Sequence, residues 1–418
     1  MENKSSTNTN DPTDHSIHPN KYSDIYQAPI RRDILLEFLT SKAILVAGTL
    51  LAVLSTAVAI VNSIHRSMDF QWSGTRLLLH HHDPWAIYLS GDPGHEILMS
   101  QIPLYLHELY VLLLPFAFLP FSKAKILWAV CNVCFVLILG WSLARLCELD
   151  RLKTWLLFVL VLMSTPFRVT VGNGQNDALV LMCIGLWAFA YTQRQRGLLL
   201  GIAYLKYSFP PILVVFLLLR RKWKLLLYSI IPPLIGFAFA DVWLSTGWRT
   251  LAFDPFRTEI HQTGGFVLGL TDIMSVSEAF LRSLAHTSEW LTRLPYGIAV
   301  LVACAIAAYF ARNCSEVDGR ILLACLLMAS LTCFQHMIYD FLVLIFSVAV
   351  ALKSNASVAR NLVMVLIAYF WYLERILDIR RWESNPLILL FHFLALIILI
   401  GATYQLRHDT QWSSHWEI

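Results

Sequence analysis

Long apolar runs recur from about residue 43 to residue 405, separated by short polar stretches. A helix needs roughly 20 residues to cross a hydrocarbon core of about 30 Å. None of the runs shows the two-residue alternation of a barrel strand, and backbone groups in lipid need internal partners. The pattern therefore predicts an all-α polytopic membrane protein with about 10–12 transmembrane helices. The twelve predicted runs are 43–64, 104–121, 126–146, 154–171, 178–193, 197–219, 225–246, 295–312, 320–335, 337–353, 359–376 and 386–405.

Composition supports this class. Hydrophobic residues make up 57% of the chain and charged residues only 14%, against about 25% charge in soluble domains. This excludes a soluble globular protein, a disordered chain and a nucleic-acid-binding module. Of the eight cysteines, only Cys131 and Cys134 have CxxC spacing, and they lie inside an apolar run. They indicate neither a disulfide framework nor a zinc site.

Residues 1–40 are polar and lack the pattern of a signal peptide, so we expect a disordered cytoplasmic tail. A single transmembrane domain at 41–405 and a cytoplasmic tail at 406–418 follow. Positive residues precede the first run and follow the sixth, which places both groups in the cytoplasm. They are Arg31, Arg32 and Lys42, then Arg220, Arg221, Lys222 and Lys224.

The positive-inside bias is poor in the middle of the chain, where a plain zigzag would leave five basic residues outside. These residues are Arg145, Arg151, Lys153, Arg194 and Arg196. The segments 154–193 and 197–219 are therefore either full spans or short hairpins. In the second case residues 172–174 and 207–211 form the tips.

Two polar insertions, at about 65–103 and about 247–294, fall on the outer side in the zigzag and mark the expected catalytic or binding face. In the second insertion, residues 271–294 alternate apolar and polar positions at helical spacing. Trp290 and Tyr296 suit an interface belt, so part of this loop is expected to lie flat on the membrane.

An acidic residue follows the first apolar run directly. Asp69 would be held at a defined depth by that helix, and partial desolvation would raise its basicity. It is therefore a candidate general base. The alternative is a hydrated interfacial carboxylate, or one that caps the next helix.

The segment from Asp69-Phe70 through Asp83-Pro84-Trp85 resembles the first outer loop of glycosyltransferase family 87. Further matches follow in the same order over residues 45–350, although no single motif is specific. One departure is Tyr105-Leu106-His107-Glu108, where the family commonly has Tyr-Pro-Pro. The other matching positions are residues 105–120, Pro166, Gly174-Gln175-Asn176, Gly201, Lys206, Pro210-Pro211, residues 220–223, Gln335-His336 and Tyr339-Asp340.

The resemblance implies a GT-C fold and use of polyprenyl-phosphate sugars. Members include polyprenol-phosphate-mannose-dependent α-mannosyltransferases. It implies no metal and no cofactor, and a monophosphate leaving group held by cations needs neither. It also puts His336 near the reaction centre, where the ring would pair with a phosphate or orient an acceptor hydroxyl.

Ionisable residues at membrane depth are costly unless they face protein or water. Lys206 lies in the middle of a run shortly before a Pro-Pro break, so it is a candidate for binding the donor phosphate, with Arg76 as a second cation. The alternative is a snorkelling lysine, or a partner of Asp241.

His336 and Asp340 stand at i and i+4, so we expect them to share a helical face. A purely structural pair is the alternative. Gln175 and Asn176, followed by Asp177, offer donors and acceptors to sugar hydroxyls, or else cap the helix that follows. Asp83 and Tyr105 are expected to shape the site or contact the acceptor.

His80-His81-His82 are adjacent, and three such side chains on a regular helix cannot converge on one ion. A hydrated loop is the simpler interpretation, and no metal site is predicted.

These features predict an inverting hexosyltransferase, with mannose as the expected sugar. The donor is a polyprenyl-phosphate sugar, and the acceptor is a glycolipid or polysaccharide of the cell envelope. The active site faces the outer side, periplasmic or extracellular, of the cell membrane. The rival class is a secondary transporter or lipid flippase, but the halves of the chain show no internal repeat. An inactive scaffold for envelope assembly is a third class.

Overall fold

The computed structural model describes residues 41–91, 93–206, 208–245, 247–262, 272–284, 294–355, 358–373 and 386–408, with the single residues 410, 416 and 418. Across these ranges the secondary structure is helical and no strand occurs. The predicted all-α class is confirmed. The predicted tail at 1–40 lies outside the described residues, as do Trp290 and most of 263–293.

Five helical segments in the described part of the chain are long and apolar enough to span a bilayer, which confirms a multi-pass membrane protein. They are α2 (Lys42–Arg66), α6 (Phe121–Leu146), α12 (Trp223–Ser229) with α13 (Ile231–Leu244), α16 (Leu294–Asn313) with η3 (Cys314–Glu316), and α21 (Pro386–Gln405) with η7 (Leu406–His408). A sixth span results if α7 (Arg151–Met163) and α8 (Thr165–Asn173), which meet at 58°, are one bent helix.

The other predicted runs form helices shorter than a span, so the predicted number of full-length spans is not reached among the described residues. These elements are α5 (His107–Ala117), α9 (Asp177–Phe189), α10 (Gln193–Ala203), α11 (Pro210–Leu219), α17 (Gly319–Cys333), η4 (Ile338–Leu344), α18 (Ile345–Lys353), α19 (Val358–Ala368) and η5 (Tyr369–Leu373).

Local sequence explains where the two central segments break. The Ser164 hydroxyl accepts a hydrogen bond from Phe167 N at 3.2 Å and caps α8. Gly174 ends that helix in the left-handed conformation at φ 73°, which favours glycine. A second break separates α10 from α11, where Pro210 starts the new helix. The breaks at Gly174 and before Pro210 fall at the tips expected for short hairpins, whereas the break at Ser164 does not.

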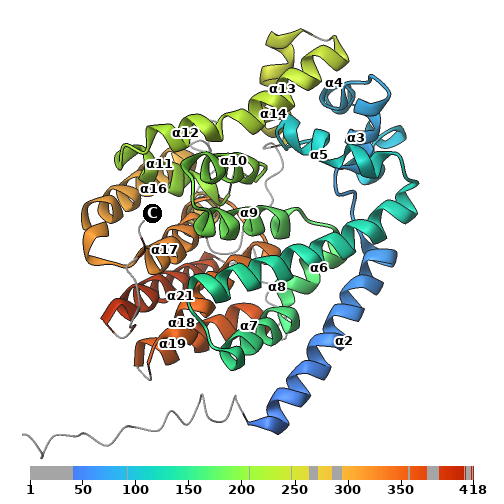
Figure 1. Ribbon diagram of the computed structural model, residues 1–418. Helices are drawn as coiled ribbons and strands as arrows, with labels where there is room; N and C mark the ends of the chain where they lie inside the picture. The colour runs from blue at the N-terminus through green and yellow to red at the C-terminus, as the bar shows by residue number, and fades with distance from the viewer. Residues whose placement is uncertain are drawn as a thin grey trace, which may run out of the picture.

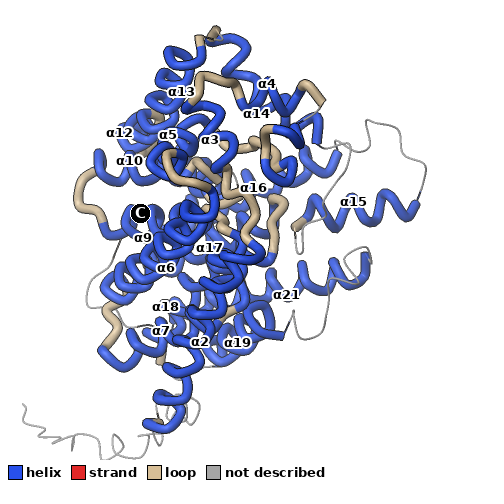
Figure 2. The backbone as a smooth tube through the Cα atoms, turned by 90° about the vertical axis from the view of Figure 1, so that its right-hand side faces the viewer, coloured by secondary structure: helices blue, strands red, loops and turns tan. Residues whose placement is uncertain are grey.

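A small outer layer covers one end of the helical bundle (Figure 1). It contains α3 (Trp72–Leu79), α4 (Pro84–Leu89), α14 (Trp248–Gln262), α5 and the end of α13. Two short turns, η1 (Pro93–His95) and η2 (Leu98–Ser100), complete the loop after α4. Its own apolar core consists of Leu78, Trp85, Tyr110, Ala240 and Leu251. On another side of the molecule, α15 (Ile273–Leu284) packs on α16 and α21 (Figure 2).

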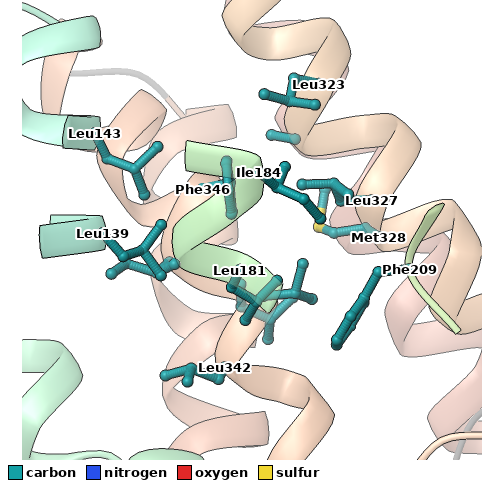
Figure 3. Close-up of a cluster of buried hydrophobic side chains, with 14 of the residues drawn as sticks. Leu139, Leu143, Leu181, Ile184, Phe209, Leu323, Leu327, Met328, Leu342 and Phe346 are labelled. Carbon is teal, nitrogen blue, oxygen red and sulfur yellow. The ribbon is translucent and has the colours of Figure 1, made fainter. Parts of the chain in front are cut away.

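The main core lies between α6, α9 and α17, with α9 in the middle (Figure 3). Leu181 and Ile184 of α9 pack between side chains of α6 and α17. The labelled members of this cluster are Leu139, Leu143, Leu181, Ile184, Phe209, Leu323, Leu327, Met328, Leu342 and Phe346. Phe209 comes from the turn between α10 and α11, so this core also positions that turn.

Glycines allow several helices to approach closely. A Cβ on Gly185 of α9 would lie 2.7 Å from Leu139 Cδ1 of α6, and one on Gly201 of α10 would lie 2.4 Å from the Ser229 carbonyl. On Gly236 of α13 it would lie 2.4 Å from the backbone N and Cα of Glu108. Any larger residue at these positions would separate the helices.

Candidate active site

Three charged side chains from separate elements meet in a buried ionic centre. Lys206 lies in the turn between α10 and α11, Asp177 begins α9, and Asp340 lies in η4. Lys206 Nζ is 2.6 Å from Asp177 Oδ1 and 2.5 Å from Asp340 Oδ1. All three residues are buried. We call this set the Lys206 centre.

Two aromatic rings lie close to Lys206, and a backbone N–H bonds one of its acidic partners. Lys206 Nζ lies 4.5 Å from the ring centroid of Tyr339 and 5.5 Å from that of Phe209. Asp340 Oδ2 accepts a hydrogen bond from Met337 N at 2.6 Å. Asp177 and Asp340, not Asp241, are therefore the acidic partners of Lys206.

His336 occupies a different environment from the one its spacing predicts. Residues 334–337 are not helical, so the expected helical pair of His336 with Asp340 is wrong. The His336 side chain instead turns its Nδ1 toward the Phe334 carbonyl, at 3.2 Å, and toward Asp272 Oδ2, at 3.7 Å. Lys206 still lies within electrostatic range of the ring.

The turn before α9 carries polar groups that face the same region. The Asn176 side chain does not cap α9, and it lies near the Tyr105 hydroxyl. Asn176 Oδ1 and Asp177 Oδ2 are buried and accept no hydrogen bond from the described residues. Gln175 lies in the same turn and is partly exposed. Buried acceptors of this kind are costly unless a ligand or water satisfies them.

Asp69 is held in the short loop that follows α2. Its side chain is only 3% exposed, and its carboxylate accepts hydrogen bonds from Ser73 N at 3.2 and 3.3 Å. Burial raises the pKa of Asp69 above its ordinary value, and these bonds to Ser73 offset the rise only in part. A buried carboxylate with a raised pKa is a stronger base than a hydrated one.

This loop is fixed to the turn that precedes the Lys206 centre. Met68 N donates to the Asn173 carbonyl at 3.2 Å, and Trp128 Nε1 donates to the Gly174 carbonyl at 3.0 Å. Phe70 stacks on Trp128 with a centroid distance of 5.4 Å. Asp69 and the Lys206 centre are therefore anchored to opposite ends of one short turn, residues 173–177.

Two tyrosines of the outer layer lie between these groups. The Tyr110 hydroxyl donates to Gln71 Oε1 at 3.0 Å, and it lies within electrostatic range of both Asp69 and Tyr105. Gln71 is 3% exposed and has the left-handed φ of 71°. Such a conformation costs energy in a residue other than glycine, and it is often found at functional sites.

Arg76 and Asp83 lie elsewhere in the outer layer. Arg76 is exposed; its Nη1 donates to the Ala117 carbonyl at 3.2 Å, and the guanidinium lies over Trp72. Asp83 caps α4, because its Oδ1 accepts from Trp85 N at 2.9 Å and Ala86 N at 3.1 Å. Neither residue makes a described contact with the Lys206 centre.

The described residues contain no cluster of three or more histidine, cysteine or acidic side chains that could hold a metal ion. In the histidine run, His81 stacks on Trp243 with a centroid distance of 4.5 Å. Its Nδ1 lies 2.9 Å from the Trp243 carbonyl. These contacts give His81 a structural role in joining α3 to α13.

The sequence did not reveal two sets of contacts: the approach of Asp272 to His336, and the pairing of Lys206 with its two acidic partners. Asp272 accepts hydrogen bonds from Ser275 N at 2.7 Å and Ser275 Oγ at 2.9 Å, as a helix cap at the start of α15. The Asp-x-x-Ser spacing is a recognisable capping signal. It gives no sign that the same carboxylate faces His336.

Comparison with known families decides the class. The model of glycosyltransferase family 87 matches residues 109–338, more than half of the chain. The chain belongs to glycosyltransferase family 87. No curated protein and no solved structure gives a significant match. The family 87 match contains Asn176, Asp177, Lys206 and His336, and it begins after Asp69. The protein is thus a membrane glycosyltransferase, as its resemblance to the family led us to expect.

Proposed function

We propose that this glycosyltransferase moves a hexose, with mannose the expected sugar, from a polyprenyl-phosphate donor to a glycolipid or polysaccharide acceptor. The reaction takes place on the outer face of the cell membrane, within the cell envelope. The observation that carries the proposal is the buried Asp69 carboxylate, fixed beside a turn rich in unsatisfied polar groups.

In this proposal Asp69 is the general base. The acceptor hydroxyl attacks the anomeric carbon from the face opposite the phosphate, and its proton passes to Asp69 as the new C–O bond forms. The bond from the anomeric carbon to the phosphate oxygen breaks, and polyprenyl phosphate leaves. The raised pKa of Asp69 suits this task, since general-base catalysis is worth about 10² to 10⁴ in rate.

The donor would lie against the turn before α9 and the Lys206 centre. Asn176 Oδ1 and Asp177 Oδ2 are unsatisfied acceptors for sugar hydroxyls, and Gln175 is a further polar contact. Lys206 is already paired with two carboxylates, so holding the phosphate requires it to exchange one carboxylate for a phosphate oxygen. His336 is the second group proposed to contact the donor.

The outer layer would supply the remaining contacts. Arg76 is exposed on α3, where a phosphate at headgroup level can reach it. Tyr105 would shape the acceptor side through its contact with Asn176, and Asp340 would position Lys206. Asp83 would shape the site through the turn that begins α4. None of these steps uses a metal ion or a cofactor.

The test is transfer of radiolabel by purified protein in nanodiscs, with polyprenyl-phosphate-[³H]mannose as donor and a membrane lipid extract as acceptor. We expect Asp69→Asn to lose about 10² or more in kcat because asparagine cannot take up the proton.

Asp83→Asn is the matched control, because asparagine caps a helix as well as aspartate does. It should retain nearly full activity. If Asp69→Asn keeps more than about a tenth of wild-type turnover, Asp69 is not the base. No transfer by the wild type with any of several donor sugars would contradict the proposed donor class and revive the transporter alternative.

A further inference from the structure

A short π-helical turn, η5, follows α19 and carries four consecutive aromatic residues. Single π-helical turns are rare and are frequently found at functional sites. In this turn Trp371 is 1% exposed, and its Nε1 donates a hydrogen bond to the Phe341 carbonyl at 2.8 Å. The ring of the preceding residue, Phe370, stacks on the Phe341 ring at a centroid distance of 4.9 Å. Two neighbouring residues of η5 therefore hold one residue of η4, by its backbone and by its side chain.

The residue held in this way directly follows Asp340, which pairs with Lys206. Local hydrogen bonds fix the shape of this turn, because Asp340 Oδ2 accepts from Met337 N at 2.6 Å and Asp340 N donates to the Met337 carbonyl at 2.9 Å. These bonds lie within one segment and do not fix its distance from Lys206. The Trp371 hydrogen bond comes from 30 residues further along the chain. It therefore helps to fix where the Asp340 carboxylate stands.

We propose that Trp371 is a positioning residue of the Lys206 centre. Its hydrogen bond to η4 keeps the Asp340 carboxylate in place against Lys206. This inference rests on the proposed function, in which Lys206 holds the donor phosphate. Since Lys206 must exchange a carboxylate for a phosphate oxygen, a displaced Asp340 changes how well the lysine binds the donor. Trp371 thus acts on donor binding through Asp340.

Trp371→Phe removes the indole N–H, and two further variants serve as matched controls. Tyr372→Phe removes another hydrogen bond of η5, which the Tyr372 hydroxyl donates to the Leu160 carbonyl of α7 at 2.8 Å. Trp187→Phe removes the same volume from a fully buried tryptophan whose Nε1 has no hydrogen-bond partner among the described residues. The first control accounts for a lost hydrogen bond in this turn, and the second accounts for the cavity left by the smaller ring.

The first measurement is a double-mutant cycle on unfolding in mixed micelles with SDS, which requires no donor. Asp340→Asn removes the charge that pairs with Lys206, so a change that acts through this pair should cost less in that background. We expect Trp371→Phe to raise the unfolding equilibrium constant by a factor that is more than about twofold smaller in Asp340→Asn than in wild type. Each control should have the same effect in both backgrounds. Effects of Trp371→Phe that agree to within about twofold in the two backgrounds would overturn the proposal.

Hydrogen exchange of the single variants tests the same contact without the double variant. The backbone amides of η4 should exchange at least about twofold faster in Trp371→Phe than in either control, as expected for the loss of one buried hydrogen bond. Exchange of η4 at the rate of the controls would also overturn the proposal.

Donor kinetics separate this inference from the proposed function. Trp371→Phe should raise KM for the donor by about threefold or more with a smaller change in kcat, while both controls keep the wild-type KM. Coupling to Asp340 with an unchanged donor KM would support the positioning of Asp340 and contradict the donor contact of Lys206. Coupling in a protein that transfers sugar from none of the donors would support the positioning and contradict the proposed donor class.

Discussion

Replacing Lys206 by methionine tests the Lys206 centre most directly. Methionine is similar to lysine in length and removes only the charge and its hydrogen bonds. In the variant, the two carboxyl groups of Asp177 and Asp340 remain buried together without their cation. We therefore expect Lys206→Met to destabilise the fold strongly, beyond any effect on activity.

The structure gives the size of the effect. At separations of 2.6 and 2.5 Å and an effective dielectric constant of about 20, each contact carries a Coulomb energy of about 6 kcal/mol. Desolvation of the three buried charges offsets most of this energy. The measured cost of removing one partner from a buried pair, about 3–5 kcal/mol, is therefore the expected loss in free energy of unfolding.

The assay is unfolding by SDS titration in mixed micelles, with the membrane-inserted yield as a check. The triple variant Lys206→Met with Asp177→Asn and Asp340→Asn should recover at least half of the lost stability, because no unpaired charge remains. Lys353→Met is the control: Lys353 pairs with Glu148 at 3.2 Å near the surface, and we expect a loss of at most about 1 kcal/mol. A loss below about 1 kcal/mol in Lys206→Met would refute the description of this centre.

Three further predictions concern other parts of the molecule. Asp69 must be ionised to act as a base, and burial raises its pKa. As the pH is lowered, kcat/KM should therefore begin to fall at a higher pH than it would with a hydrated aspartate as the base. This acidic limb of the pH profile should be absent in Asp69→Asn. The same shift means that the folded protein binds this proton more tightly than the unfolded chain, so the group's contribution to stability declines as pH rises through its pKa. Gly236→Ala should lower the folded yield, because the new Cβ would lie 2.4 Å from the α5 backbone. Gly297→Ala is the control, since nothing lies within 4 Å of its Cβ position. It should leave the folded yield unchanged or stabilise the protein by up to about 1 kcal/mol. In intact cells, an impermeant thiol reagent should label a cysteine introduced at the exposed Ser90 more strongly than it labels the parent protein. A cysteine introduced at Lys224 should be labelled only after lysis. The reverse result would place the outer layer in the cytoplasm.

The all-helical class could be predicted because apolar runs of span length leave no other backbone arrangement in lipid. The number of full spans could not. Helix α17 has an apolar sequence, yet all fifteen of its residues are buried in protein, whereas α2 buries only Ala52, Ser55, Ala59 and Ser63. Hydrophobicity alone does not distinguish a side chain that faces lipid from one that faces a neighbouring helix.

For the site, the sequence identified Asp69, Lys206, His336 and Asp340 as candidates, but their partners depend on tertiary structure. Lys206 meets Asp177 from 29 residues away, across a turn that only the folded chain creates. The i, i+4 rule failed for His336 because the helix ends at Cys333 and the backbone is extended at Phe334, so His336 and Asp340 no longer share a face. Charge at membrane depth marks a candidate functional position and leaves its partner unspecified.

The glycine contacts between helices affect whether a helix packs against a neighbouring helix or against lipid tails. Lipid tails solvate leucine about as well as another helix does, so apolar side chains give neighbouring helices little reason to prefer one another over lipid. A helix that meets a glycine on its neighbour can approach more closely than a flexible acyl chain can pack. At Gly185, Gly201 and Gly236 the protein therefore excludes lipid by shape. The contact at Gly201 involves α10, which ends three residues before Lys206, so the same exclusion keeps acyl chains away from the helix that leads into the Lys206 centre.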